Sequence, residues 1–225
     1  MQHQTTPPSP AQLARYNINI PGNFSGITFP LFDSVAYPAA GTAQLTLFQT
    51  PAGQGGKTLA DTNMQAAGQV PSPNVFVVTG LALKFISGAP VELLGAAAAI
   101  DYVADVHAFY NGLTAGATLV GSYLEFASGS SYYVREPLWM FPPAARLAIS
   151  GASSNASTAA ASQFYVTEFA ENSGIPYEIA PLALPANQTF QVTLNWPGGV
   201  VAMPSTKAGR AIAVLNGWMY RPTQG

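Results

Sequence analysis

The sequence contains no cysteine and very little charge, and each absence excludes a class of protein. Without cysteine, the chain has neither a disulfide framework nor thiol chemistry. Charged residues make up 8% of the 225 residues, whereas an ordinary soluble domain has roughly 25%. The formal net charge is −2, so no strong field attracts nucleic acid or an anionic membrane surface.

Histidine and long apolar runs are also scarce. The two histidines are His3 and His107, which leaves one structured candidate for a general base and too few imidazoles for a histidine metal centre. No apolar run reaches about 18 residues, so no membrane-spanning helix is predicted. The first ten residues contain neither Lys nor Arg and no apolar stretch, so we do not expect a secretory signal there.

What the chain does contain is apolar and neutral polar side chains. The hydrophobic fraction is 48%, enough for a sizeable core, and Ser, Thr, Asn, Gln, Gly and Ala stand where charge is usually found. Charged residues are depleted in the cores of protein–protein interfaces. The composition therefore favours a protein that packs against copies of itself.

Alternation of apolar and polar residues recurs along the chain with a period of two, which is typical of β-strands. It is strictest at Thr189–Trp196. The later run Arg210–Tyr220 is apolar on both faces over much of its length, which predicts a central strand. Further predicted strands are Tyr16–Ile20 at an edge, Ala43–Phe48, Asn74–Phe85, Thr118–Phe126, Ser131–Val134, Gln163–Phe169 and Glu178–Leu184.

One window predicts a helix. Residues 92–111 are Ala-rich with apolar residues near a helical repeat, and Gly112 is a suitable stop, so we expect a short helix at about 93–107. Long loops are predicted at 49–73, 136–161 and 197–209, the second including a surface loop at 149–161.

These elements predict an all-β fold. About eight strands separated by Gly and Pro turns indicate a β-sandwich or barrel, and a single antiparallel jelly roll if the first good strand pairs with the last. Residues 1–14 are rich in Pro, Gln and Thr and are predicted to form a flexible arm. No linker divides the remainder, so we expect one domain at 15–225.

One segment imitates a phosphate-binding loop. Pro51–Thr58 contains the Gly-Lys-Thr of that motif, but Pro51 occupies the position of its first glycine. Proline has no N–H with which to join an anion cradle. A flexible loop is therefore predicted here.

Two groups of carboxylates are candidates for a site. Asp101 and Asp105 share a helical face but His107 points elsewhere, which favours a solvated or interface helix face over a metal site. Glu125 and Glu136 could form a glycosidase-like pair, but a strand and its following loop make them simple polar-face or loop residues. We predict no catalytic residue, no cofactor and no metal ligand, and we do not expect an enzyme.

Large aromatic residues gather in the second half of the chain. Core and subunit packing is their common role, although a lectin uses such rings to stack on sugars. We predict five anchors of the core or of an interface: Trp139, Phe141, Trp196, Trp218 and Tyr220.

Three groups of segments carry a resemblance to a known family. They are Leu59–Met64 with Gly68–Pro71 and the strand Asn74–Phe85; Tyr132–Pro142; and Phe190–Trp196 with Arg210–Arg221. Together they cover about half of the chain. They resemble the vertical jelly-roll capsid proteins of tailless icosahedral bacteriophages. The virions of these phages often contain a membrane. Many relatives of this kind carry two jelly rolls per chain, whereas the length and strand count here fit one.

The resemblance implies a viral structural protein, expected to be the major capsid protein, that self-assembles into capsomers of an icosahedral shell. Its implied partners are copies of itself, other capsid proteins and an internal membrane, and its implied location is the virion after assembly in the host cytoplasm. Direct nucleic-acid binding is not expected, because Arg15 is the only basic residue among the first fifty.

Two alternatives remain open. One is a virion spike, fibre or lectin-like jelly roll that binds carbohydrate, which needs exposed aromatic residues and acceptors grouped at one end. The other is a cupin-type enzyme, which needs several histidines and a carboxylate inside the barrel. The sequence disfavours the latter because one of its two histidines lies in the predicted arm.

Overall fold

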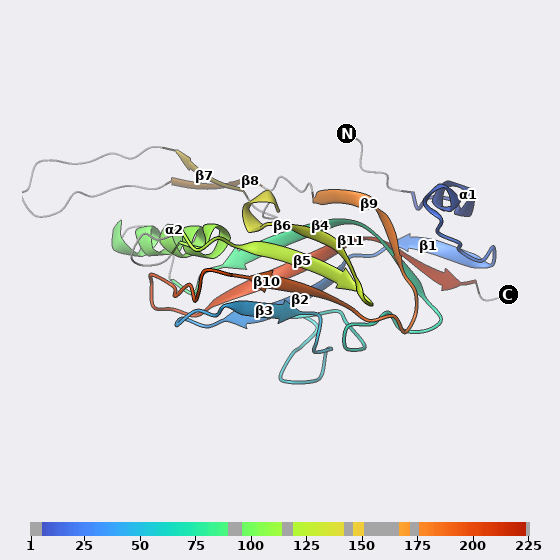
Figure 1. The fold of residues 1–225 in the computed structure, drawn as a ribbon, viewed down its shortest axis with the longest axis horizontal. Helices are drawn as coiled ribbons and strands as arrows, with labels where there is room; N and C mark the ends of the chain where they lie inside the picture. The colour runs from blue at the N-terminus through green and yellow to red at the C-terminus, as the bar shows by residue number, and fades with distance from the viewer. Residues whose placement is uncertain are drawn as a thin grey trace, which may run out of the picture.

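The computed structural model describes residues 6–89, 96–113, 119–141, 146–150, 167–171 and 176–223. Two antiparallel sheets face each other across a shared core (Figure 1). The first sheet contains β1 (Phe24–Thr28), β2 (Leu31–Tyr37), β4 (Val75–Ile86), β9 (Tyr177–Leu184) and β11 (Gly209–Pro222). The second contains β3 (Gln44–Leu47), β5 (Tyr123–Ser128), β6 (Ser131–Pro137) and β10 (Phe190–Asn195).

The remaining elements lie outside these sheets. The helices are α1 (Pro10–Leu13) and α2 (Ala96–Asn111), with 3₁₀ turns η1 (Ala14–Tyr16) and η2 (Leu138–Met140). A separate antiparallel pair is formed by β7 (Arg146–Ser150) and β8 (Thr167–Glu171).

Eight strands pair as one long nested hairpin, which is the topology of a jelly roll. The antiparallel pairs are β2 with β11, β3 with β10, β4 with β9 and β5 with β6, each inside the one before it. Two further ladders, β11 with β4 and β10 with β5, close the roll. The resulting orders are β2-β11-β4-β9 and β3-β10-β5-β6. The predicted fold, a single all-β jelly roll, is confirmed.

Strand β11 is central, as its apolar faces predicted. It pairs with β4 along one side, and with β2 and then β1 along the other. The ladder with β4 shifts register between Asn216 and Gly217. A Cβ at position 217 would lie 2.0 Å from the carbonyl oxygen of Val77, so glycine is required where the two backbones approach.

One core strand was not predicted. The strand that pairs with β11 is β2, whereas the predicted strand Ala43–Phe48 becomes β3 and pairs with β10. Strand β2 escaped the period-two pattern because Asp33 and Ser34 are both buried in its middle. The short strand β1 was also missed, since none of its residues is buried.

Several predicted boundaries move. The expected edge strand Tyr16–Ile20 is no strand, because η1 is followed by Asn17 in the left-handed region with φ 57°. Strand β5 begins at Tyr123 and not at Thr118, while β6 continues to Pro137. Helix α2 runs on to Asn111, and Gly112 follows it with φ 64°.

Several predictions concern residues that are described only in part. The predicted helix at about 93–107 is described as α2 from Ala96 onward, and residues 93–95 lie outside the described residues. The predicted strand Gln163–Phe169 coincides with β8 from Thr167 onward, and residues 163–166 lie outside the described residues. The predicted surface loop 149–161 overlaps the end of β7, whose Ile149 and Ser150 pair with β8. Residues 151–161 lie outside the described residues.

An aromatic cluster joins the two sheets to α2 at one end of the sandwich. The rings of Phe85 on β4 and Phe109 on α2 stack with centroids 4.3 Å apart, and Tyr37 contacts both rings edge-on. Trp196 follows β10, lies 5.1 Å from the Tyr37 ring and donates its indole N–H to the Phe109 carbonyl at 3.1 Å. This cluster fixes the position of the helix against the roll.

A second, smaller cluster lies at the other end of the first sheet. Leu13 and Ile18 from the N-terminal segment pack with Val77 and Tyr220. Ser9 caps α1, and the Tyr220 hydroxyl donates to the Pro8 carbonyl at 2.8 Å. The last part of the predicted arm 1–14 is thus packed against the sheet.

Candidate functional site

The five predicted anchors fall into two groups. Phe141, Trp196 and Tyr220 are buried in the chain's own core, and Trp218 is half-buried beside the second cluster. Trp139 is 65% exposed on η2 and makes no part of that core. It is therefore the anchor that is free to contact another molecule.

Exposed aromatic side chains follow the edge strand β6. Tyr132 and Tyr133 are 60% and 46% exposed, and Trp139 lies on η2 directly after β6. The ladder with β5 shifts between Phe126 and Ala127, which pair with Val134 and Tyr132 and leave Tyr133 as an extra residue. Such a bulge re-aims a side chain, so two consecutive tyrosines both reach solvent. We call Tyr132, Tyr133 and Trp139 the aromatic edge.

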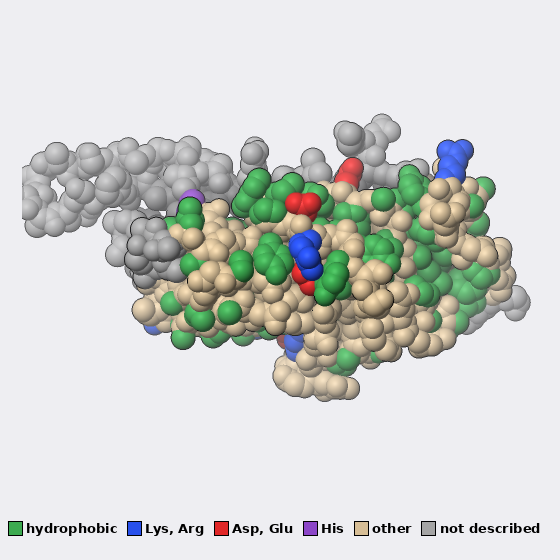
Figure 2. Space-filling view, viewed as in Figure 1, with side chains coloured by type: hydrophobic (Ala, Val, Ile, Leu, Met, Phe, Trp, Pro, Cys, Tyr) green, Lys and Arg blue, Asp and Glu red, His purple; other side chains and the backbone are tan. Residues whose placement is uncertain are grey.

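The aromatic edge has one charged neighbour pair. The Arg135 guanidinium lies 4.5 Å from the centre of the Tyr132 ring, and its Nε donates to Glu125 Oε2 at 2.9 Å. Figure 2 shows the surface over β5, β6 and β10 as mostly neutral, with apolar patches around a small group of charged atoms. Since edge strands also carry unpaired backbone groups, this edge is suited to contact with a partner.

Lys57, in the loop that imitates a phosphate site, forms an ion pair with Asp33. Its ammonium lies 2.5 Å from Asp33 Oδ1, and both side chains are largely or fully buried. The other carboxylate oxygen of Asp33 accepts the Phe48 N–H at 2.6 Å. The lysine therefore holds the β3–β4 loop to β2 and is not free to bind a phosphate.

Of the two expected settings for Asp105, a solvated or an interface helix face, the structure excludes the solvated one. This carboxylate is fully buried and accepts the backbone N–H of Ser205 at 3.0 Å and the Ser205 hydroxyl at 2.6 Å. The Ser87 hydroxyl also donates to it. The sequence could not show that Asp105 is buried, because its partner Ser205 lies 100 residues away along the chain.

The other candidate ligands do not converge. His107 is exposed and contacts Asn111, while the side chain of Asp101 lies outside the described residues. No group of three or more His, Asp or Glu that could hold a metal ion occurs within the described ranges. Glu125 lies opposite Arg135, whereas Glu136 lies opposite Leu124, so the two glutamates are on opposite faces of the sheet. They cannot act together on one bond.

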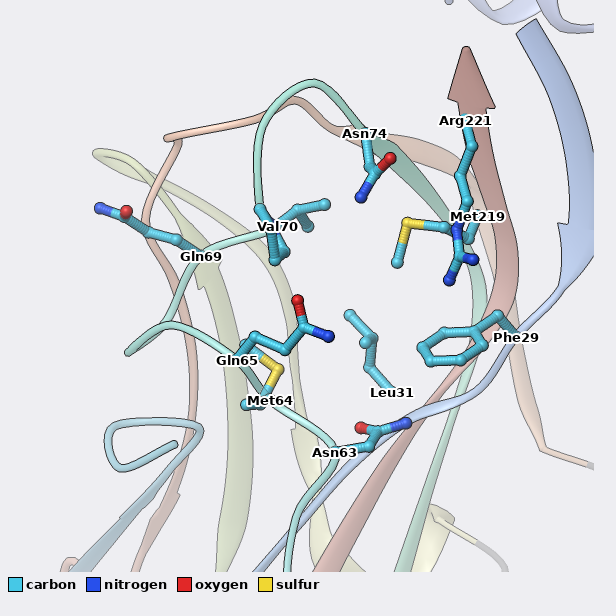
Figure 3. Close-up of a pocket in the computed structure, with 11 residues that line it drawn as sticks. Phe29, Leu31, Asn63, Met64, Gln65, Gln69, Val70, Asn74, Met219 and Arg221 are labelled. Atoms are coloured by element: carbon cyan, nitrogen blue, oxygen red, sulfur yellow. The ribbon is translucent and has the colours of Figure 1, made fainter. Parts of the chain in front are cut away.

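A pocket that the sequence did not predict opens at the end of the sandwich opposite the cluster of Phe85 and Phe109 (Figure 3). We call it the end pocket. It contains about 360 Å³ of space, part of it open to solvent, and is lined by the β3–β4 loop, the β1–β2 connection and the end of β11. Residues 63–74 reach Arg221 only in the folded chain, so no local motif marks them.

Among the described residues, four ionisable side chains have shifted pKa values, each for an identifiable reason. Burial raises the pKa of Tyr37 to about 12, raises that of Tyr220 to about 12, and raises that of Tyr110 as well. The Thr58 backbone N–H, assisted by Arg210, lowers the pKa of Asp61 to about 2. None of these residues belongs to the aromatic edge or lines the end pocket.

No described helix has the length and apolar character needed to cross a membrane. Comparison of the chain with protein-family models, with curated proteins and with solved structures finds no match.

Proposed function

We propose that the chain is a viral structural protein, the major capsid protein of an icosahedral bacteriophage shell, which assembles with copies of itself into capsomers. The observation that carries the proposal is a complete jelly roll whose sequence contains very little charge. Jelly rolls serve as viral capsid domains, and also as lectins and cupins. Scarce charge favours the first of these roles, because a subunit in a shell buries much of its surface against its neighbours.

The aromatic edge is the contact surface that the proposal selects. Tyrosine and tryptophan are enriched where interfaces concentrate their binding energy. The three residues project from an edge strand and the turn that follows it, which a neighbouring subunit can approach from the side. Other capsid proteins and an internal membrane are further proposed partners.

Light scattering coupled to size-exclusion chromatography, with electron microscopy of the same sample, tests self-assembly. We expect capsomers or shells. A 23.4 kDa monomer that persists at high concentration would contradict the proposal.

A variant that replaces Tyr132, Tyr133 and Trp139 with serine is expected to stay folded and to lose assembly. The matched control is Leu59→Ser, because Leu59 is 76% exposed but lies on the β3–β4 loop, away from the aromatic edge. If both variants assemble equally well, the aromatic edge is not part of the contact surface. The jelly-roll fold would not be called into question by that result.

An alternative proposal is a spike, fibre or lectin-like module that binds carbohydrate. It is favoured by the same exposed rings, because Tyr133 and Trp139 offer faces for sugar stacking. A glycan array distinguishes the two proposals. Specific binding that is lost in Trp139→Ala or Tyr133→Ala, by a chain that stays monomeric, would favour the carbohydrate-binding module.

A further inference from the structure

The end pocket contains one charged side chain, Arg221, among the eleven residues that line it. No acidic residue lines the pocket to neutralise it. The ion pairs formed within the described residues use Lys57, Arg135 and Arg210, and Arg221 takes part in none of them. The pocket therefore presents a positive charge without a counter-charge.

The backbone and one aromatic ring aim this charge at the pocket. Arg221 follows Met219 on the same face of β11, and Met219 is buried between the sheets. The ladder with β1 fixes Arg221 opposite Ser25. Its guanidinium carbon lies 5.7 Å from the centre of the Phe29 ring. Figure 3 shows the guanidinium of this exposed arginine beside Met219 and Phe29, at the edge of the pocket.

Two amide side chains share that space. In Figure 3, Gln65 and Asn74 point toward the same region as Arg221, whereas Gln69 points away. The side chains of Gln65 and Asn74 make no hydrogen bond to any described residue. Asn63 differs, because its amide accepts the Phe32 N–H at 2.9 Å and donates to the Pro30 carbonyl at 2.7 Å.

The floor of the pocket is apolar and rigid. Leu31, Met64, Val70 and Met219 are all buried and belong to the main core. A floor of carbon atoms favours the apolar face of a ligand. The cavity itself has a volume of about 40 Å³ and the rest of the space is open to solvent, so a ligand enters it only in part. The polar groups lie around the opening and not beneath it.

We propose that the end pocket binds a small monocarboxylate, whose neutral body enters the pocket in part and otherwise stays in solvent. The Arg221 fork matches a carboxylate with two parallel N–H···O bonds. Gln65 and Asn74 donate to, or accept from, neutral polar atoms of the body, and the apolar floor contacts its carbon face. The proposal is independent of the capsid role.

Calorimetric titration of the full chain, in whichever oligomeric state it adopts, tests this with two acid–neutral pairs. The sugar pair is methyl β-D-glucuronide and methyl β-D-glucoside, and the amino-acid pair is N-acetyl-L-leucine and N-acetyl-L-leucinamide. We expect at least one acid to bind about tenfold or more tightly than its neutral partner, since a charge-assisted pair is lost in the latter. The pair that responds identifies the source of the carboxylate.

Substitutions separate the pocket from general charge effects. Arg221→Gln is expected to weaken binding of that acid by about tenfold or more, and Arg221→Lys by less, because lysine keeps the charge but loses the fork. Arg15→Gln removes another exposed arginine, which does not line the pocket, and should bind as the unmodified chain does. The thermal midpoints confirm that each variant is folded.

Three results would overturn the proposal. One is no binding of either acid up to about 10 mM, which is weaker than a useful site. Another is equal affinity for acid and neutral partner. The last is equal loss of binding in Arg221→Gln and Arg15→Gln, since this would assign binding to net charge.

Discussion

At the scale of single residues, Asp105 joins three parts of the chain that are far apart in sequence. It receives two hydrogen bonds from Ser205 and one from Ser87. Asp105→Ala leaves the buried Ser87 hydroxyl and the half-buried donors of Ser205 without this partner, so we expect a loss of about 3 kcal/mol in the free energy of unfolding. Ser205→Ala keeps the backbone N–H paired and should cost about 1 kcal/mol. Urea denaturation at equal protein concentrations measures both.

The order of these two losses tests the role of Asp105. If Asp105→Ala costs no more than Ser205→Ala, the carboxylate does not fasten the β10–β11 loop to α2.

Tyr37 makes stability depend on alkaline pH. Its pKa rises from 10.0 to about 12 in the folded chain, because burial disfavours the phenolate. Between these values the unfolded chain loses the proton and the folded chain keeps it, so the stabilisation present below pH 10 is lost as the pH rises to 12. Tyr220, shifted to a similar value, adds to the same decline.

Tyr37→Phe isolates this contribution. The variant loses the hydroxyl bond to the Val201 carbonyl, 2.6 Å long, and should be about 1 kcal/mol less stable at neutral pH. Above pH 10 its unfolding midpoint should fall less steeply than that of the unmodified chain. Parallel slopes from pH 9 to 12 would contradict the shifted pKa of Tyr37.

At the scale of elements, β11 supports the whole first sheet. It pairs with three strands, and Ala211, Ala213 and Leu215 are buried in the core. A chain that ends at Gly209 would leave β2 and β4 with unpaired inner edges, so we expect loss of folding and not merely of assembly. Circular dichroism and amide exchange measure this. A truncated chain that keeps a cooperative unfolding transition would show that β11 is peripheral.

An element could be predicted when the residues that stabilise it lie within its own segment, and not when they lie far away in the sequence. Strands β10 and β11 were recognisable because apolar side chains mark each buried face: they alternate with polar residues in β10 and occupy both faces of much of β11. Strand β2 was not, because its buried Asp33 is stabilised by Lys57 and by the Phe48 N–H, contacts that only the folded chain makes. The end pocket was hidden for the same reason, since it joins Gln65 to Arg221 across most of the sequence.

The sequence predicted a set of aromatic anchors but not which of them face solvent. The sequence marked Trp139 and Phe141 as one group of anchors, yet η2 turns Trp139 outward and Phe141 inward. Tyr133 reaches solvent through a bulge in the ladder of β5 and β6, which no pattern in the sequence reveals. The direction of each ring is therefore a property of the folded edge.

At the scale of the whole molecule, the scarcity of charge determines how assembly should respond to salt. Only eight basic and ten acidic residues are present, and three ion pairs form inside the described part of the chain. Few charges then remain for contacts between subunits in the proposed assembly, so we expect apolar burial to provide most of its association energy. Apolar contacts are not screened by salt, whereas contacts between exposed charges are.

We therefore expect the midpoint concentration for assembly to change less than about threefold between roughly 50 mM and 500 mM NaCl, although the Debye length shortens about threefold over that range. Light scattering across a protein dilution series measures the midpoint. Arg135→Gln removes the charge next to Tyr132 and serves as a control, because its midpoint should shift little if Tyr132 acts through apolar contact. A midpoint that rises tenfold or more with salt would mean that charge pairs hold the subunits together, and the aromatic edge would then lose its proposed role.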